Sequence, residues 1–181
     1  MKLWLVRHAQ PLIAPGVCYG ATDVPADAQA TLQAAQVLAR TLPPGVLLVS
    51  SPLQRCEHIA QYLRGLRPDL SYTIDARLAE MNFGCWEAQR WDAIPQTEFD
   101  RWMAAFDEHR FGGEESVLEF MQRVARAWDE TRLVGRDAVW ITHAGVIRAA
   151  TLLAQGVRQV TQAAQWPREA PAFGRWSELQ L

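Results

Sequence analysis

Two arginines and two histidines lie at or just beyond the ends of short apolar stretches of the chain: Arg7, His8, Arg55 and His143. Arginine presents a planar fork of N–H donors that suits phosphate oxygens. A neutral imidazole nitrogen can attack phosphorus without adding a second negative charge, and the labile phosphoramidate divides one difficult displacement into two easier ones. Neighbouring arginines also disfavour the protonated imidazole. These residue types fit phosphoryl transfer through His8.

The leaving oxygen of such a reaction needs a proton, which a carboxylic acid can supply. Glu80 is the candidate, and Glu87 is a competing carboxylate nearby in the sequence. Each residue also has a plainer interpretation, because a lone histidine at a strand end is more often structural and a lone arginine is usually solvated or ion-paired. From the spacing alone, the two interpretations are about equally open.

The four side chains meet only if their apolar stretches are neighbouring strands. The runs at 3–6, 46–49 and 138–141 are typical of buried parallel strands. Weaker patterns at 71–75 and 176–179 predict two further strands. Ligands of open α/β sheets bind outside the carboxyl ends of the strands, so the candidate residues should meet at one edge.

Helical patterns alternate with these strands, over 27–42, from 50 to about 63, over 116–133 and from 145 to about 153. Ser116 and Glu119 have the spacing of a capping box, which marks the start of the third helix. The alternation predicts an α/β fold, a three-layer sandwich with a largely parallel sheet and helices on both faces.

One domain is expected over residues 1–181, because the chain contains no repeat, linker or low-complexity stretch. The segment at about 78–113 is rich in tryptophan and acidic residues and predicts a small helical insertion that forms a lid. Within it, helix is expected after Trp86 and again after Pro95.

Composition excludes several classes of function. The apolar fraction of 49% and charged fraction of 21% are ordinary for a globular protein, and the net charge of −2 provides no footprint for nucleic acid or an anionic membrane. No apolar run is long enough for a membrane span, and no signal peptide is evident. Three cysteines without a CxxC pair predict neither disulfides nor zinc, so we expect a cytoplasmic protein without metal or cofactor.

Three motifs together resemble those of the histidine phosphatase superfamily, in its phosphoglycerate-mutase-like branch: Leu5-Val-Arg-His-Ala9, Ser51-Pro-Leu-Gln-Arg55 and Thr142-His-Ala-Gly-Val-Ile-Arg148. They occur in the family's order along nearly the whole chain. The resemblance implies that His8 is phosphorylated, that Arg7, Arg55 and His143 complete the phosphate site, and that Glu80 is the proton donor. Ala9 and Ala144 stand where the family usually has glycine, which alanine replaces poorly at positive φ.

Within the superfamily, the segments Pro15–Pro25 and Phe83–Glu87 resemble the α-ribazole phosphatase group, whose members act in cobalamin assembly. The resemblance implies that Tyr19, Gly20, Trp86 and Ala144 contact the substrate. Trp86, Trp91 and Trp102 can stack on an aromatic base, although packing within the insertion is their plainer role.

The expected activity is therefore hydrolysis of a small-molecule phosphomonoester. A phosphoglycerate mutase or sugar-bisphosphate phosphatase of the same superfamily is the first alternative, but mutases are longer, with segments that shield the phosphoenzyme from water. The second alternative is an inactive phosphate-binding or interaction module, against which the presence of every expected catalytic side chain argues. A homodimer is left open.

Overall fold

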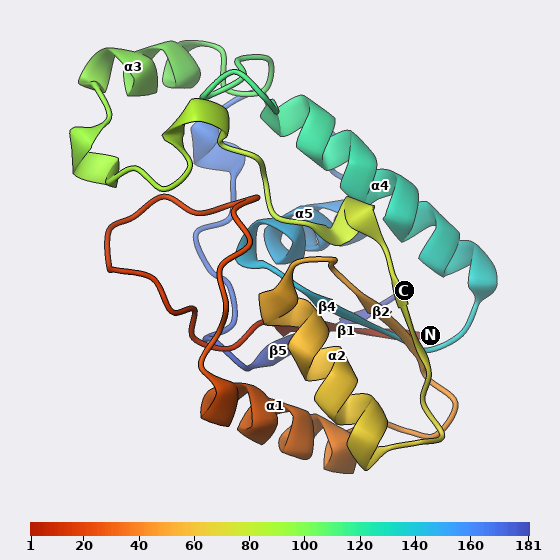
Figure 1. Cartoon of the computed structure of the whole chain (residues 1–181). Coiled ribbons are helices and arrows are strands. Elements are labelled where there is room, and N and C mark those ends of the chain that lie inside the picture. Colours follow the sequence, from red (N-terminus) through yellow and green to blue (C-terminus); the bar gives the residue numbers. More distant parts are fainter.

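The structure, a computed structural model that describes residues 1–181, centres on one five-stranded sheet with the strand order β3-β2-β4-β1-β5 (Figure 1). The strands are β1 (Lys2–Arg7), β2 (Leu47–Ser50), β3 (Tyr72–Ile74), β4 (Ala138–Thr142) and β5 (Trp176–Gln180). The first four are parallel, and β5 pairs antiparallel with β1 at the edge. The predicted α/β sandwich with a largely parallel sheet is confirmed.

Helices cover both faces of the sheet because the central strands are apolar on both sides (Figure 1). In β1, Leu3 and Leu5 belong to one hydrophobic core, whereas Trp4 and Val6 belong to the other, as the alternation of side chains along a strand requires. Helices α4 (Val117–Val134) and α5 (Ala144–Ala154) enclose the first core, and α1 (Ala28–Thr41) and α2 (Gln54–Leu66) enclose the second.

Local signals set most helix boundaries. The Asp27 side chain accepts a hydrogen bond from the backbone of Ala30 at the start of α1, and Ser116 and Glu119 form the expected capping box of α4. The α2 helix begins later than predicted, at Gln54, so Pro52 lies outside its first turn. Its first backbone N–H donates to the distant Asp23 side chain at 2.8 Å, a contact that no local pattern reveals.

The segment predicted to form a lid, residues 78–113 and called the lid below, is less helical than predicted. It contains one α-helix, α3 (Gln96–Ala104), and single 3₁₀ turns at Gly84–Trp86 and Trp91–Ala93. The helix expected after Trp86 is absent because Ala88 has a left-handed conformation, with φ at 63°, which ends regular structure there.

Aromatic side chains give the lid its own small core. Phe111 is fully buried and packs against Trp102 and Phe99, with ring centroids 4.4 and 5.3 Å apart. Packing is therefore a main role of the lid's aromatic residues.

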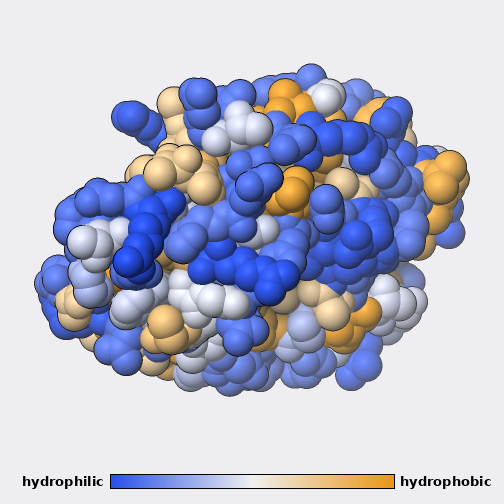
Figure 2. All heavy atoms as spheres, turned by 90° about the horizontal axis from the view of Figure 1, so that it is seen from above, coloured by the Kyte–Doolittle hydropathy of each residue, from blue (hydrophilic) through white to orange (hydrophobic).

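Seen from above, the molecular surface is mainly polar, with small hydrophobic groups scattered over it (Figure 2). No helix combines the length and the apolar character that a membrane span requires.

Candidate active site

The candidate residues converge because β1, β4 and β2 are neighbours and end at the same edge of the sheet. His8 continues from β1, and its backbone N–H donates to Thr142 O of β4 at 3.1 Å. Ser51 continues from β2, and its backbone N–H donates to Ile141 O at 2.9 Å. These bonds extend the parallel ladder by one residue, which fixes the positions from which the site's side chains project.

The two histidine rings lie together, with centroids 5.2 Å apart. Arg55 Nε donates to His143 Nδ1 at 3.3 Å, so Nδ1 must present its lone pair. The other ring nitrogen, Nε2, then carries the proton and donates to Ser51 Oγ at 2.8 Å. Burial, together with the nearby charge of Arg55, lowers the pKa of His143 well below its usual value, so this fully buried ring is neutral.

His8 has the opposite tautomer. Its Nδ1 lies 2.7 Å from Ala9 O, and a carbonyl can only accept, so Nδ1 carries the proton. This leaves the lone pair on Nε2, where it can act as a nucleophile. Burial is the main cause that lowers the pKa of His8 from 6.5 to about 3; the bond to Ala9 opposes the shift, and the charges of Arg55 and Arg7 add to it. The ring is neutral at physiological pH.

The two predicted arginines are held in different ways. Arg55 is fully buried, and its two terminal nitrogens donate to Gly20 O at 2.6 Å and Thr22 O at 2.8 Å. Arg7 lies over the Phe173 ring at 3.9 Å and has a buried Nε without a hydrogen-bond partner. Burial lowers the pKa of Arg7, although the group stays far from losing its proton. A bound anion would satisfy the orphan N–H of Arg7.

Glu80 belongs to the lid, and its side chain reaches the start of α5. Its carboxylate accepts hydrogen bonds from the backbone N–H groups of Gly145 and Met81, each at 3.0 Å. A Cβ on Gly145 would lie 2.2 Å from Glu80 Oε1, so only glycine leaves room for this carboxylate. Arg123 supports the segment from behind by donating to Glu80 O at 3.0 Å and pairing with Glu115 at 2.6 Å.

Glu87, the competing carboxylate, is fully engaged by the loop that follows Cys18. It accepts backbone hydrogen bonds from Gly20, Ala21 and Thr22 at 2.9–3.1 Å, and a further bond from the Thr22 hydroxyl. Burial alone would raise the pKa of Glu87, but these donors outweigh it and lower the pKa. Because the same loop supplies the carbonyls that hold Arg55, Glu87 positions that arginine without reaching the cavity.

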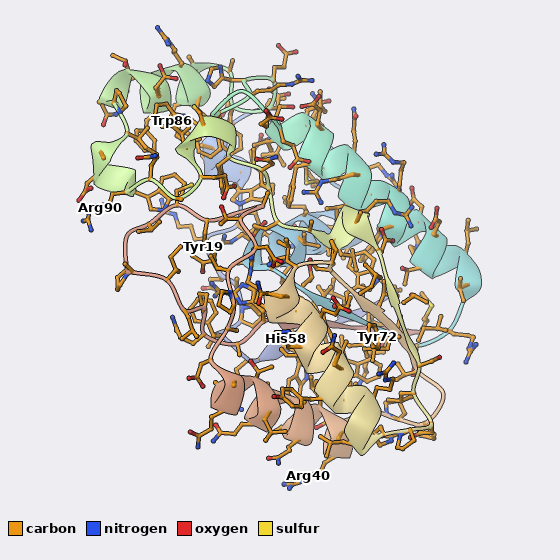
Figure 3. All side chains as sticks on the ribbon, viewed as in Figure 1. Tyr19, Arg40, His58, Tyr72, Trp86 and Arg90 are labelled. Atoms are coloured by element: carbon orange, nitrogen blue, oxygen red, sulfur yellow. The ribbon has the colours of Figure 1, made fainter.

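A cavity of about 320 Å³ lies over His8. It is lined by Arg7, His8, Val17, Tyr19, Arg55, Glu80, Trp91, Ala144 and Arg148. Of the predicted site residues, His143 lies behind His8 and Arg55 and does not line it. Gly20 does not line the cavity either, and its backbone carbonyl holds Arg55. Trp86 packs against Phe111 in the lid, whereas Tyr19 lies below Trp86 in the view, to one side of the sheet (Figure 3).

Two lining residues, Val17 and Arg148, are absent from the sequence prediction. Arg148 follows Ala144 by four positions in α5, and residues with this spacing share one helix face, so the helical pattern contained the signal. Val17 lies in an irregular loop, where no periodicity predicts a side chain's direction.

The alanines that replace the family's usual glycines fit their positions. Neither Ala9 nor Ala144 has a positive φ, so neither backbone needs glycine. Ala88 is the one residue other than glycine in the left-handed region. In the Gly112–Ser116 segment, both glycines have positive φ, at 85° and 94°, which explains the residue type at each.

The buried neutral histidines predict a pH-dependent stability. Unfolded histidine takes up a proton near pH 6.5, but His8 in the folded protein does not until about pH 3. The free energy of unfolding that depends on a neutral His8 is therefore fully present above pH 6.5. It falls by about 1 kcal/mol per pH unit as the pH drops toward 3. Denaturant unfolding at pH 7, 6 and 5 should give a shallower pH slope for His8→Gln than for wild type. The exposed His58→Gln is the matched control, and equal slopes in all three proteins would contradict the assignment.

Comparison with known proteins agrees with this geometry. A mycobacterial glucosyl-3-phosphoglycerate phosphatase, Rv2419c, superposes with a TM-score of 0.79 at 22% identity, over 98% of this chain and 88% of that one. The protein TTHB049 from Thermus thermophilus gives 0.73 at 28% identity, over 99% of this chain and 93% of that one. No curated protein matches the sequence significantly. The model of the histidine phosphatase superfamily (branch 1) matches residues 3–171, and the chain belongs to this family.

Proposed function

We propose that the protein hydrolyses phosphomonoesters through a phosphohistidine on His8 Nε2. One observation carries the proposal. His8 is a buried neutral imidazole whose free lone pair is on Nε2, and three arginines line the cavity above it. In the first step, the nitrogen–phosphorus bond forms as the ester oxygen–phosphorus bond breaks, and Glu80 protonates the leaving oxygen. In the second step, water attacks phosphorus, the nitrogen–phosphorus bond breaks, and the Glu80 carboxylate takes the water's proton.

The charges around His8 suit this reaction. The guanidinium groups of Arg7, Arg55 and Arg148 can neutralise the equatorial oxygens as the transition state loosens. They supply the positive charge that a metal brings to other phosphatases, so the proposal includes metal independence. The mycobacterial structural relative has also been solved with VO3, at a TM-score of 0.80 and 23% identity, which supports this fold as a scaffold for phosphate chemistry.

A direct test is to trap the phosphoenzyme. Brief incubation with a radiolabelled phosphomonoester, followed by quenching, should yield an acid-labile, base-stable label on His8. Chelator treatment beforehand should leave the yield unchanged. His8→Ala should lose both the label and essentially all activity while remaining folded by circular dichroism. Near wild-type turnover by His8→Ala would refute the mechanism, and folded wild type that turns over no phosphomonoester would favour the inactive binding module.

A second test separates the two carboxylates. Glu80 lines the cavity over His8, where its carboxyl group can reach the leaving oxygen. Glu80→Gln should therefore slow hydrolysis of alkyl phosphates by about 10²-fold or more, but affect para-nitrophenyl phosphate much less, because that leaving group needs no proton. Glu87→Gln is the matched comparison. It weakens the clamp on the Arg55 loop and should reduce both rates by similar factors; the reverse pattern would exchange the two roles.

As substrate, we propose α-ribazole 5′-phosphate or its cobamide-linked form, within the reducing cytoplasm. The support is the resemblance of residues 15–25 and 83–87 to the α-ribazole phosphatase group, together with Tyr19 at the cavity wall. Because Trp86 lies outside the cavity, Tyr19 and Trp91 are the aromatic residues that line it. A mutase or sugar-bisphosphate phosphatase remains the competing proposal.

Substrate preference distinguishes these proposals. One aromatic stack contributes about 0.5–1.5 kcal/mol beyond burial, roughly a factor of 2 to 13 in binding. We therefore expect a clear but not absolute preference, measured as kcat/KM for α-ribazole 5′-phosphate beside 3-phosphoglycerate and fructose 2,6-bisphosphate. If either glycolytic compound is preferred by tenfold or more, the cobalamin assignment fails and the phosphohistidine chemistry is unaffected.

A further inference from the structure

A second and larger cavity, of about 740 Å³, adjoins the one over His8. The two cavities share three lining residues, Tyr19, Glu80 and Arg148. The larger cavity lies between the lid, α4 and the segment that follows α5, and its size is within the range of small-molecule sites. None of its other lining residues contributes to the candidate catalytic chemistry, apart from Gly145, which contacts Glu80.

The wall of this cavity is largely aromatic and apolar. Its apolar side chains come from three separate parts of the chain, and they include Trp102 and Phe106 of the lid, Phe120 of α4, and Ala164 and Trp166 of the segment after α5. The ring of Trp166 lies 6.5 Å from that of Phe106 and 6.2 Å from that of Phe120. Trp102 and Trp166 are only half-buried, so parts of both rings remain open to contact.

The position of Glu80 shows which part of a substrate would occupy each cavity. A proton donor must lie beside the oxygen of the bond that breaks. Glu80 lines both cavities, so that bond lies at their junction, with phosphorus toward His8 and the leaving group on the far side.

Arg148 marks the same junction. Its terminal nitrogen donates to Arg168 O at 2.9 Å, which ties the segment after α5 to the site. Its buried Nε has no hydrogen-bond partner in the protein. This N–H is therefore free to donate to an oxygen of a bound substrate.

We propose that the larger cavity binds the leaving group and selects phosphomonoesters of alcohols with an aromatic body. The inference rests on the proposed phosphatase activity and adds to it the class of leaving group. A sugar or glycerate without an aromatic group would lose hydration against an apolar wall and gain no aromatic contact in return. An aromatic alcohol instead gains apolar burial and edge or face contacts with Trp102 and Trp166.

The test compares ethyl phosphate with 2-naphthylmethyl phosphate, both esters of primary alcohols, so that the demand for protonation is similar. We expect kcat/KM to favour the naphthylmethyl ester about tenfold or more. Trp166→Leu should reduce this selectivity ratio several-fold. Trp176→Leu, which replaces a half-buried tryptophan of β5 outside both cavities, is the matched control and should preserve the ratio.

A second variant covers the case in which Trp166→Leu does not fold. Ala164 is exposed and lines the cavity, so Ala164→Trp adds bulk without disturbing a core, and it should also reduce the ratio. Binding of 2-naphthylmethanol, followed by tryptophan fluorescence, tests the cavity without any chemistry. It should saturate in wild type and weaken in Ala164→Trp.

The outcomes separate the inference from the activity on which it rests. Equal kcat/KM for both esters in wild type, with hydrolysis abolished in His8→Ala, would overturn the leaving-group site and leave the phosphatase intact. Hydrolysis that persists in His8→Ala would overturn the proposed mechanism, and naphthylmethanol binding would still decide whether the cavity accepts an aromatic alcohol.

Discussion

The candidate site depends on keeping the His8 imidazole uncharged while positive guanidinium groups lie beside it. Burial achieves this directly, because removing the ring from water disfavours its charged form, and Arg55 and Arg7 act in the same direction. The bond from Nδ1 to Ala9 O then determines which nitrogen retains the lone pair. The charges of Arg55 and Arg7 also attract a phosphate dianion, so these two arginines contribute both to anion binding and to keeping the nucleophile neutral.

The arginines must be held without neutralising them, and the structure does so with carbonyl groups in place of carboxylates. Arg55 donates to Gly20 O and Thr22 O, which orient it but leave its full charge for an anion. The loop that carries these carbonyls is held in turn by Glu87 of the lid, through its backbone N–H groups. The negative charge of Glu87 is thus spread over several donors away from the cavity. This loop therefore connects the lid to the phosphate site by hydrogen bonds on both sides.

The sequence predicts well what depends on local periodicity and poorly what depends on distant contacts. Three strands and the convergence of His8, Arg55 and His143 follow from apolar runs that end in polar residues, because parallel strands share one carboxyl edge. The other two strands follow from weaker patterns. The late start of α2 depends on Asp23, and the role of Glu87 depends on a loop about 65 positions away in the sequence. The packing of the half-buried Trp86 on Phe111 within the lid is likewise a contact that neither spacing nor motif reveals.

The two cavities also differ in the regularity of the elements that form them. On the phosphate side, Arg7 and His8 lie at the end of β1, and Arg55, Ala144 and Arg148 lie in the helices α2 and α5 that pack on the sheet. The larger cavity is built from the lid, α4 and the segment after α5, of which the lid and that segment are mostly irregular. Substitutions in the segment after α5 change the wall without altering the pairing of the central strands, from which His8 projects. Function on a shared fold commonly diverges in this way, with the reacting groups held by rigid elements and selectivity set by the segments around them. On the proposed leaving-group site, substrate identity is therefore set by the lid and the segment after α5.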